Sequence, residues 1–327
     1  MVVFVSAPCS HHSPSSGYHQ LVECFPGAPW IASIERGRIR WQREPAGAAS
    51  GARSVAELDR LHRPIWHVLH ADLASTVRDI RREAPRARIV ATLHQPKWFV
   101  RELGFDQEAN VADADVVVVV SRRQLPDLAS LARRVVAVPH GVWPHAFHPD
   151  ETPEVDPRSW LVVGEHLRDW GLIEQVCERT AAAGISWTFV VPRRASGALR
   201  IRGVTIESDV SERRLADLYH RAGGTLFALV DATANNALLE ALSAGCPIVA
   251  NDLRGAREYA AEAAEYYRTG DVAGCLRAID RVATMDPARR RGRAAEQMAR
   301  AQQYVWTGVA RRFRSLFRAL EAERARE

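Results

Sequence analysis

The stretch 226-LFALVDATANNALLEALSAGCPIVANDLRGAREY-259 decides the fold. Residues 226–230 form a short apolar run bounded by polar residues, which is typical of a buried strand. Residues 237–244 are strong helix formers, and Gly245 stands where a helix C-cap belongs. A second apolar run follows at residues 247–250. The pattern predicts a strand, a helix and a second strand, which together form one βαβ unit of a parallel sheet.

The loop between this first strand and the helix carries candidate ligand-binding residues. Four of them have side chains that accept hydrogen bonds from free helix amides: Asp231, Thr233, Asn235 and Asn236. In open α/β sheets ligands bind at this edge, and the bare amides and the helix dipole favour a phosphate. Glu240 lies four residues after Asn236, on the same side of the helix. We expect its carboxylate to accept two neighbouring hydroxyls, as on a ribose.

Length and composition indicate a soluble globular protein. The chain has 327 residues, enough for two domains, and is 47% hydrophobic and 25% charged. No apolar run approaches the roughly 20 residues that span a bilayer. The N-terminus, MVVFVSAP, lacks a basic segment and reads directly as a strand, so we expect no signal peptide. We therefore expect a cytoplasmic protein.

The basic charge says little about partners. The formal charge is +5, but Lys97 is the only lysine, so the arginines reflect a bias of the whole composition. Acidic and basic residues are interspersed, and we expect no nucleic-acid binding. Arginines beside Phe313 and Phe317 in the tail leave open a peripheral contact with the inner face of a membrane. Packing of this apolar stripe against the first domain explains it equally well.

We expect no metal site. Asp113-Ala114-Asp115 spells a metal-binding DxD, but it directly precedes the valines at 116–120, where it would end a helix and turn the chain. The five cysteines are scattered without a CxxC pair, which disfavours a disulfide framework or a zinc site. Two groups of histidines lack the helical spacing and acidic partner of a metal site: residues 11, 12 and 19, and residues 62, 67 and 70.

Strands and helices alternate along both halves of the chain. Further strands are expected at residues 2–5, 30–34, 66–70, 88–93, 116–120, 134–138, 160–163, 186–191 and 204–207. Further helices are expected at residues 18–24, 55–61, 73–83, 170–183, 212–221 and 272–285 and over most of the tail. Four prolines between residues 143 and 158 indicate a linker. The pattern predicts an α/β protein of two Rossmann-like, doubly wound domains facing across a cleft.

Several segments, taken in order, resemble family 4 glycosyltransferases, which have the GT-B fold. The run NNALLEALSAGCPIVAND at 235–252, with Glu258 after it, is similar to the donor-site segment of that family. Other similar segments are TLH at 92–94, ADVVVVVS at 114–121, VPHGV at 138–142, FHP at 147–149, VTIESDVSERRLADLY at 204–219 and YVWT at 304–307. The likeness runs from about residue 64 onward and implies an acceptor domain at 1–148, a linker at 149–158, a donor domain at 159–300, and a helix at 301–327 that crosses back to the first domain.

The resemblance implies transfer of a sugar from a nucleotide-diphosphate sugar, with retention at the anomeric carbon and without a metal or other cofactor. The leaving diphosphate helps to take the acceptor proton, so no protein nucleophile is needed. Glu240 matches a ribose-binding glutamate and His94 an active-site histidine. Other donor-binding residues are expected to be Asn235, Asn236, Thr233, Ala234, Gly164 and His166, and acceptor-side residues Gly17 and Tyr18. The acceptor stays open: a glycan, a lipid-linked sugar or a small molecule.

Three positions depart from the family pattern. The first glutamate of its E-x7-E motif would fall at Ala232. Glu165 and Trp170 replace the arginine and lysine that neutralise the diphosphate, and positive charge held at a developing anion lowers a barrier strongly. We expect Arg168 to supply this charge from the same loop, with His166 or Arg254 as weaker substitutes.

Two other functions stay open. The missing cations favour a catalytically silent GT-B protein that binds a partner or a sugar. A sugar-nucleotide epimerase of the same fold would isomerise a donor without an acceptor.

Overall fold

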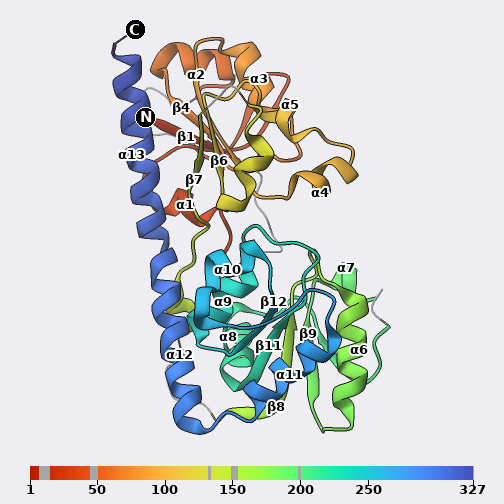
Figure 1. Cartoon of the computed structure of the whole chain (residues 1–327). Helices are drawn as coiled ribbons and strands as arrows, with labels where there is room; N and C mark the ends of the chain where they lie inside the picture. Colours follow the sequence, from red (N-terminus) through yellow and green to blue (C-terminus); the bar gives the residue numbers. More distant parts are fainter. Residues whose placement is uncertain (7–14, 45–50, 132–133, 149–153, 198–199, 327) are drawn as a thin grey trace. The chain divides into compact units, whose positions relative to one another are not determined.

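The structure is a computed structural model that describes residues 1–6, 15–44, 51–131, 134–148, 154–197 and 200–326. The chain divides into two compact units (Figure 1). Unit 1 comprises Met1–Ser10, Tyr18–Gly141 and Trp306–Glu327, and unit 2 comprises His11–Gly17 and Val142–Val305. Residues 149–153 of the expected linker, and Cys9, His11 and His12, lie outside the described residues.

Unit 1 is built on a seven-stranded sheet of order β3-β2-β1-β4-β5-β6-β7. The strands are β1 (Val2–Val5), β2 (Trp30–Glu35), β3 (Arg38–Arg43), β4 (Ile65–Val68), β5 (Arg88–Leu93), β6 (Val116–Val119) and β7 (Arg134–Ala137). All neighbours pair in parallel except β2 and β3, which form a hairpin. The sequence did not predict β3, because its residues alternate between exposed and half-buried positions without an apolar face.

The helices of unit 1 cover this sheet. They are α1 (Gln20–Glu23), α2 (Val55–His62), α3 (Thr76–Glu83), α4 (Lys97–Glu102), α5 (Gln107–Val111) and α13 (Trp306–Arg324), with 3-10 turns η2 (Arg122–Gln124) and η3 (Pro126–Leu128). The apolar stripe of α13 is buried inside the unit: the Phe313 ring centroid lies 4.8 Å from that of His67, and Phe317 lies 6.4 Å from Phe4. Packing within unit 1 therefore accounts for the apolar stripe of α13, for which the sequence also allowed a membrane contact.

Unit 2 is built on a six-stranded parallel sheet of order β10-β9-β8-β11-β12-β13. The strands are β8 (Asp156–Val163), β9 (Ser186–Val190), β10 (Val204–Glu207), β11 (Ala222–Phe227), β12 (Ile248–Asn251) and β13 (Glu265–Tyr267). Around it lie α6 (Trp170–Ala181), α7 (Arg193–Ser196), α8 (Glu212–Arg221), α9 (Asn236–Ala244), α10 (Arg254–Ala260), α11 (Val272–Ala283), α12 (Pro287–Ala301), η4 (Pro144–Phe147), η5 (Ala261–Ala263) and η6 (Gln302–Tyr304). The strand order reverses between β8 and β11, as in Rossmann sheets.

Both faces of the unit 2 sheet are buried. Along β8, Leu161 and Val163 belong to a core cluster that includes α8 and α9, and Trp160 and Val162 belong to one that includes α6 and α11. This alternation follows from the two-residue period of a strand. The sheet of unit 2 is therefore doubly wound, as the sequence predicts.

The predicted position of the first strand in the opening stretch was wrong. Residues 226–230 were expected, but β11 runs from Ala222 to Phe227, and Val230 is 54% exposed. The two glycines in β11 hid its start, because glycine is a poor strand former. They allow close packing: a Cβ on Gly223 would lie 2.3 Å from the Pro157 carbonyl oxygen, and one on Gly224 would lie 2.8 Å from the Trp160 ring.

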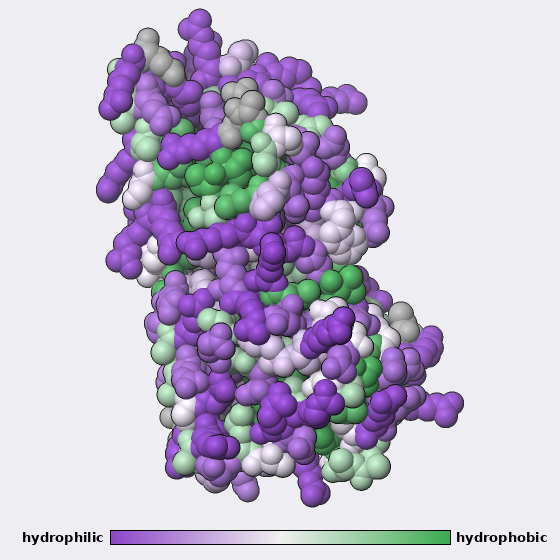
Figure 2. Space-filling view, viewed as in Figure 1, coloured by the Kyte–Doolittle hydropathy of each residue, from purple (hydrophilic) through white to green (hydrophobic). Residues whose placement is uncertain are grey.

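The visible surface is mostly polar. Figure 2 shows apolar side chains gathered in one patch on unit 1, over the region of β6 and β7 in Figure 1. The edge strand β7 holds the half-buried Val135 and Ala137, which pack on the core of this unit. Among the described residues, no helix has the length and apolar character needed to cross a membrane.

Candidate functional site

The N-terminus of α9 lies at the carboxyl edge of the unit 2 sheet, as the sequence predicts. Asn235 is the N-cap, and its side-chain oxygen accepts a hydrogen bond from the Leu238 amide at 3.1 Å. Asn236 begins the helix and is half-buried. Gly245 ends the helix in the left-handed region, with φ of 67°. The loop before α9 carries Thr233, which is buried, and Ala234, which is half-buried.

Glu240 lies inside unit 2, with 4% of its surface exposed. Its Oε1 accepts a hydrogen bond from the Ser16 hydroxyl at 2.5 Å, and its Oε2 accepts one from the Tyr219 hydroxyl at 3.2 Å. Burial raises the pKa of the Glu240 carboxyl to about 7, although both hydroxyls oppose the shift. The Glu240 carboxylate therefore already accepts hydrogen bonds from two hydroxyl groups, and a ribose would offer donors of the same kind.

Ser16 is a residue that sequence reasoning missed. It sits in the short segment Ser15–Gly17, which belongs to unit 2. The Ser15 amide and hydroxyl both donate to Glu212, at 2.8 and 2.9 Å, and the Ser15 carbonyl accepts from the Trp143 amide at 3.1 Å. The signal in the sequence was a Ser/Gly loop directly after the first strand. Of the two expected acceptor-side residues, Gly17 falls in unit 2 and Tyr18 in unit 1.

Arg168 lies beneath the loop that follows β8, and only 6% of it is exposed. Its guanidinium donates to the carbonyls of Val163 and His166 and lies over the Phe227 ring, 5.6 Å from the centroid. Burial lowers its pKa to about 10, so it stays charged at neutral pH. Gly164 has φ of 81°, a left-handed conformation that glycine adopts without strain, and a Cβ there would lie 3.2 Å from an Arg168 nitrogen. The charge of Arg168 thus supports the loop backbone.

The two residues that replace family cations have other partners. Glu165 forms an ion pair with Arg194. Trp170 packs near Phe189, with ring centroids 6.0 Å apart. His166 is exposed on the same loop. Neither replacement adds positive charge at this edge of the sheet.

Arg254 is exposed at the start of α10 and has no hydrogen-bond or ion-pair partner within the described part of the chain. The next residue, Gly255, is packed against the loop before α9: a Cβ there would lie 2.0 Å from the Ala232 carbonyl oxygen and 3.0 Å from that of Thr233. This close approach requires a glycine. It places Arg254 next to the loop that leads to Asn235.

Asn251, at the end of β12, ties neighbouring loops together. Its side-chain amide exchanges hydrogen bonds with the backbone of Leu229, at 3.0 and 2.8 Å, and donates to the Thr269 hydroxyl at 3.1 Å. Leu229 forms a bridge with Arg168, and the Val230 amide donates to the Leu167 carbonyl at 2.8 Å. The loops after β8, β11, β12 and β13 therefore form one hydrogen-bonded edge.

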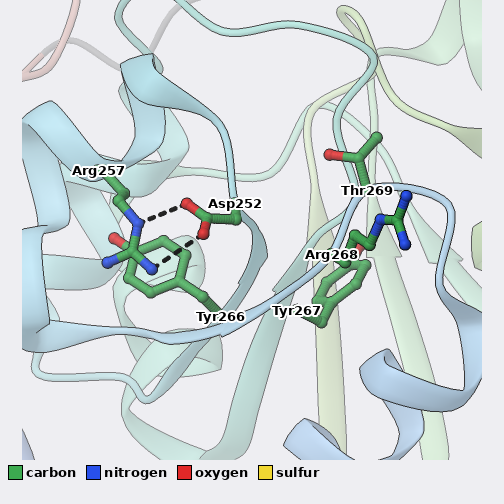
Figure 3. Close-up of a pocket in the computed structure, with 6 residues that line it drawn as sticks. All are labelled: Asp252, Arg257, Tyr266, Tyr267, Arg268 and Thr269. Carbon is green, nitrogen blue, oxygen red and sulfur yellow. Dashed lines mark hydrogen bonds and ion pairs between the residues drawn. The ribbon is translucent and has the colours of Figure 1, made fainter.

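A pocket of about 400 Å³ opens at this edge. It is lined by Asp252, Arg257, Tyr266, Tyr267, Arg268 and Thr269 (Figure 3). Arg257 pairs with both carboxylate oxygens of Asp252 and lies over the Tyr266 ring, 4.1 Å from the centroid. Arg268 and Thr269 stand on the opposite wall, after the end of β13.

In unit 1, His94 follows β5 at the carboxyl edge of its sheet. Its Nε2 donates to the Leu69 carbonyl at 2.7 Å, which assigns the proton to that nitrogen. The ring stacks on His70, with centroids 4.6 Å apart, and meets the Tyr18 ring edge-on at 4.4 Å. Tyr18 is 1% exposed, and burial raises the pKa of its hydroxyl. The structure therefore brings two predicted residues, His94 and Tyr18, into contact.

Asp72 holds the loop that carries His94, and sequence reasoning missed it. Its carboxylate accepts from the amides of His94 and Gln95, at 3.0 and 2.9 Å, and from the Gln107 side chain at 2.9 Å. Burial nevertheless raises its pKa to about 6. The signal in the sequence was an acid just after the strand that became β4, at the sheet edge where His94 was expected.

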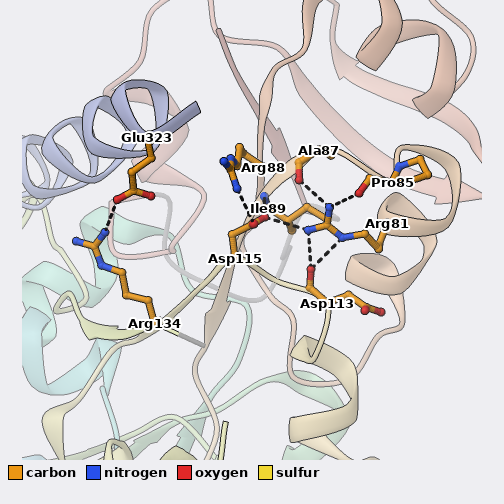
Figure 4. Close-up of polar contacts among 9 residues, drawn as sticks. All are labelled: Arg81, Pro85, Ala87, Arg88, Ile89, Asp113, Asp115, Arg134 and Glu323. Carbon is orange, nitrogen blue, oxygen red and sulfur yellow. Dashed lines mark hydrogen bonds and ion pairs between the residues drawn. The ribbon is translucent and has the colours of Figure 1, made fainter. Parts of the chain in front are cut away.

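The DxD-like sequence lies at the opposite edge of the unit 1 sheet. Asp115 pairs with Arg81 and Arg88, at 3.0 and 3.3 Å, and accepts the Ile89 amide at 2.8 Å (Figure 4). Asp113 contributes a backbone carbonyl to Arg81. These partners anchor the starts of β5 and β6. Within the described part of the chain, no group of three or more His, Cys, Asp or Glu residues could hold a metal ion.

Comparison with known proteins finds likeness in structure only. No protein-family model matches the chain, and no curated protein matches its sequence. Sucrose-phosphate synthase from Thermosynechococcus elongatus is similar, with a TM-score of 0.70, 17% identity, and coverage of 98% of this chain and 99% of that one. Trehalose 6-phosphate synthase from Burkholderia multivorans gives a TM-score of 0.70, 13% identity, and coverage of 99% and 97%. A UDP-forming trehalose-phosphate synthase from Burkholderia vietnamiensis gives 0.65, 15%, and coverage of 82% and 75%. The chain has the GT-B fold of glycosyltransferases.

Proposed function

We propose that the protein is a glycosyltransferase that moves a sugar from a nucleotide-diphosphate sugar to an acceptor, with retention at the anomeric carbon and without a metal. The observation that carries this proposal is the edge of unit 2, a Rossmann unit of a GT-B fold. At this edge the N-terminus of α9, capped by Asn235, lies one helical turn before Glu240, whose buried carboxyl accepts hydrogen bonds from two hydroxyls. Helix N-termini favour phosphates, and ligands bind at this edge of such sheets.

In the proposed complex, the diphosphate lies at the α9 N-terminus beside Asn235 and Asn236. Thr233, Ala234, Gly164 and His166 line the donor site from the two neighbouring loops. The ribose hydroxyls bind Glu240 in place of the Ser16 hydroxyl. This exchange replaces one hydroxyl donor by another, so the buried carboxyl keeps its hydrogen bonds. We propose UDP as a first nucleotide to test, because one similar structure is described as UDP-forming.

The proposed reaction breaks the bond from the anomeric carbon to the diphosphate and forms a bond to an acceptor oxygen on the same face. The acceptor proton passes to a diphosphate oxygen. Buried Arg168 contributes positive charge to the diphosphate site from beneath the loop after β8. Exposed Arg254 contributes positive charge from beside the loop before α9. His94 acts as the catalytic histidine on the acceptor side, with Gly17 and Tyr18. The names of the similar structures favour a sugar phosphate as acceptor.

A catalytically silent GT-B protein that binds a sugar or a partner is the second candidate. Specific observations favour it: alanine stands at 232, Glu165 is paired with Arg194, and Arg168 is buried against carbonyls. These features weaken the positive charge available to a leaving diphosphate. A silent protein that keeps the donor site would bind the same nucleotide sugar as the transferase and would differ only in turnover.

A thermal-shift screen of UDP-, GDP- and dTDP-sugars tests the shared claim. A ligand at 100 times its dissociation constant stabilises the folded state by about 2.7 kcal/mol, which such an assay detects. We expect one nucleotide series to raise Tm, with a smaller rise in Asn236→Ala and an unchanged rise in Glu174→Gln, which alters an exposed residue of α6. Release of nucleotide diphosphate, detected by mass spectrometry, then separates a transferase from a silent binder. No shift with any donor contradicts the transferase, and it leaves only a silent protein that binds a free sugar or a partner.

A further inference from the structure

On the basis of the function proposed above, we propose that residues 15–17 form a strap that keeps the ribose-binding carboxylate closed until a nucleotide displaces it. Ser16 is fully buried, and Glu240 is 4% exposed. A ribose therefore cannot reach the Glu240 carboxylate while the strap holds this position. The strap belongs to unit 2, as do all the residues that hold it.

The strap occupies the hydrogen-bond acceptor that a ribose would use. The Ser16 hydroxyl donates to Oε1 of Glu240 at 2.5 Å, and the Tyr219 hydroxyl donates to Oε2 at 3.2 Å. Both oxygens of this carboxylate thus have hydroxyl donors. Hydrogen bonds to a carboxylate are stronger than those between neutral groups, so the loss of the Ser16 bond offsets part of what the ribose contributes.

A second carboxylate holds the strap beside Glu240. The Ser15 amide and hydroxyl donate to the two carboxylate oxygens of Glu212, at 2.8 and 2.9 Å. The Ser15 carbonyl accepts a hydrogen bond from the Trp143 amide at 3.1 Å. Glu212 is the first residue of α8, and Trp143 is the N-cap of η4. Two elements of unit 2 therefore anchor the strap, in addition to its bond with Glu240.

Competition between the strap and the ribose lowers the affinity for a nucleotide. When the open form is a small fraction of the free protein, the apparent Kd is the intrinsic Kd divided by that fraction. Removing a bond that holds the strap raises the open fraction and leaves the nucleotide complex unchanged. Loss of the Ser16 hydroxyl should therefore tighten nucleotide binding, whereas loss of a ribose-binding group would weaken it.

Calorimetric titration of the full chain with UDP, GDP and dTDP measures this competition. Burial raises the pKa of the Glu240 carboxyl to about 7, so a titration at pH 8 keeps most of it ionised. We expect Ser16→Ala to tighten binding about tenfold, which is the effect of one hydrogen bond to a charged group. Ser15→Ala, which leaves Glu240 intact, should tighten it about threefold to tenfold. Ser186→Ala is the matched control: it removes an exposed hydroxyl at the start of β9 and should change affinity less than twofold.

Hydrogen exchange at the Ser15 amide gives a second measurement. This amide donates to Glu212 in the closed strap, so it should exchange slowly in the free protein. We expect a bound nucleotide to speed its exchange, because displacement of the strap exposes it to water. A nucleotide that bound on top of a strap still in place would slow the exchange instead.

Unchanged or weaker nucleotide binding in both Ser16→Ala and Ser15→Ala would overturn the proposal, and so would slower exchange at the Ser15 amide on binding. In either case, nucleotide binding by the wild type would leave the function proposed above standing. If no nucleotide binds the wild type or either variant, both proposals fail. Binding by Ser16→Ala where the wild type does not bind would support a closed strap.

Discussion

Compared with the wild type, the Glu240→Gln variant should become more stable as pH rises. Burial raises the pKa of this carboxyl to about 7 from an ordinary 4.5, so the folded protein holds its proton more tightly than the unfolded chain. Its contribution to stability is therefore complete below pH 4.5 and is lost as pH rises through about 7. At about 1.4 kcal/mol for each pH unit, the loss amounts to about 3 kcal/mol.

Glutamine keeps the shape and cannot ionise, so it escapes this loss. Its amide can still meet the hydroxyls of Ser16 and Tyr219, which rotate to donate or accept. We expect the unfolding free energy of Glu240→Gln, minus that of the wild type, to rise by about 2–3 kcal/mol between pH 5 and pH 8.

Urea unfolding at pH 5, 6, 7 and 8 measures this difference directly. Glu174→Gln is the matched control, because Glu174 is exposed on α6 and its difference should change by less than about 0.5 kcal/mol. A difference for Glu240→Gln that stays flat, or that falls with pH, would contradict a raised pKa of the Glu240 carboxyl in the folded protein. It would mean that the carboxyl is solvated or ionised in the folded protein.

Three further predictions concern arginine and acid residues of the two units. Arg168→Ala should lower the unfolding free energy by about 2–3 kcal/mol in urea titration, because the buried carbonyl of Val163 and the partly buried carbonyl of His166 lose a charged donor. Arg254→Ala should leave stability within about 0.5 kcal/mol and reduce the preference for UDP over UMP about tenfold in calorimetry, and an unchanged preference would remove Arg254 from the site. Asp72→Asn should destabilise unit 1 by about 1–3 kcal/mol, because the loop that carries His94 loses a carboxylate acceptor. It should also lower kcat more than KM, and a kcat equal to that of the wild type would contradict a role for Asp72 in positioning His94.

The sequence predicts the elements of this fold well wherever local signals agree. The bounds of β5 and α8 match their expected ranges, because an apolar run marks β5 and a serine N-cap marks α8. The strands β13 and β3 were not predicted, for physical reasons. β13 has three residues, too few for a periodic pattern, and β3 is held by its hairpin partner.

The candidate site is less visible in the sequence, since its chemistry depends on contacts between distant residues. Glu240 was expected to bind ribose hydroxyls from the side of the helix that carries Asn236, but residues Ala237 to Ala244 of α9 are all buried. Its hydroxyl partners come from Ser16, 224 positions away, and from Tyr219 on α8. Arg168 was expected to face a ligand, and only the folded loop reveals the two carbonyls that its guanidinium holds.

Release of nucleotide diphosphate from a donor sugar would demonstrate that the protein is a glycosyltransferase. Purified protein would be incubated with UDP-, GDP- and dTDP-sugars, with and without a hexose 6-phosphate, and the products identified by mass spectrometry and NMR. We expect consumption of at least one donor, a product with retained anomeric configuration, and a loss of turnover in Asn236→Ala that Glu174→Gln does not show. Absence of both nucleotide binding and donor consumption would contradict it.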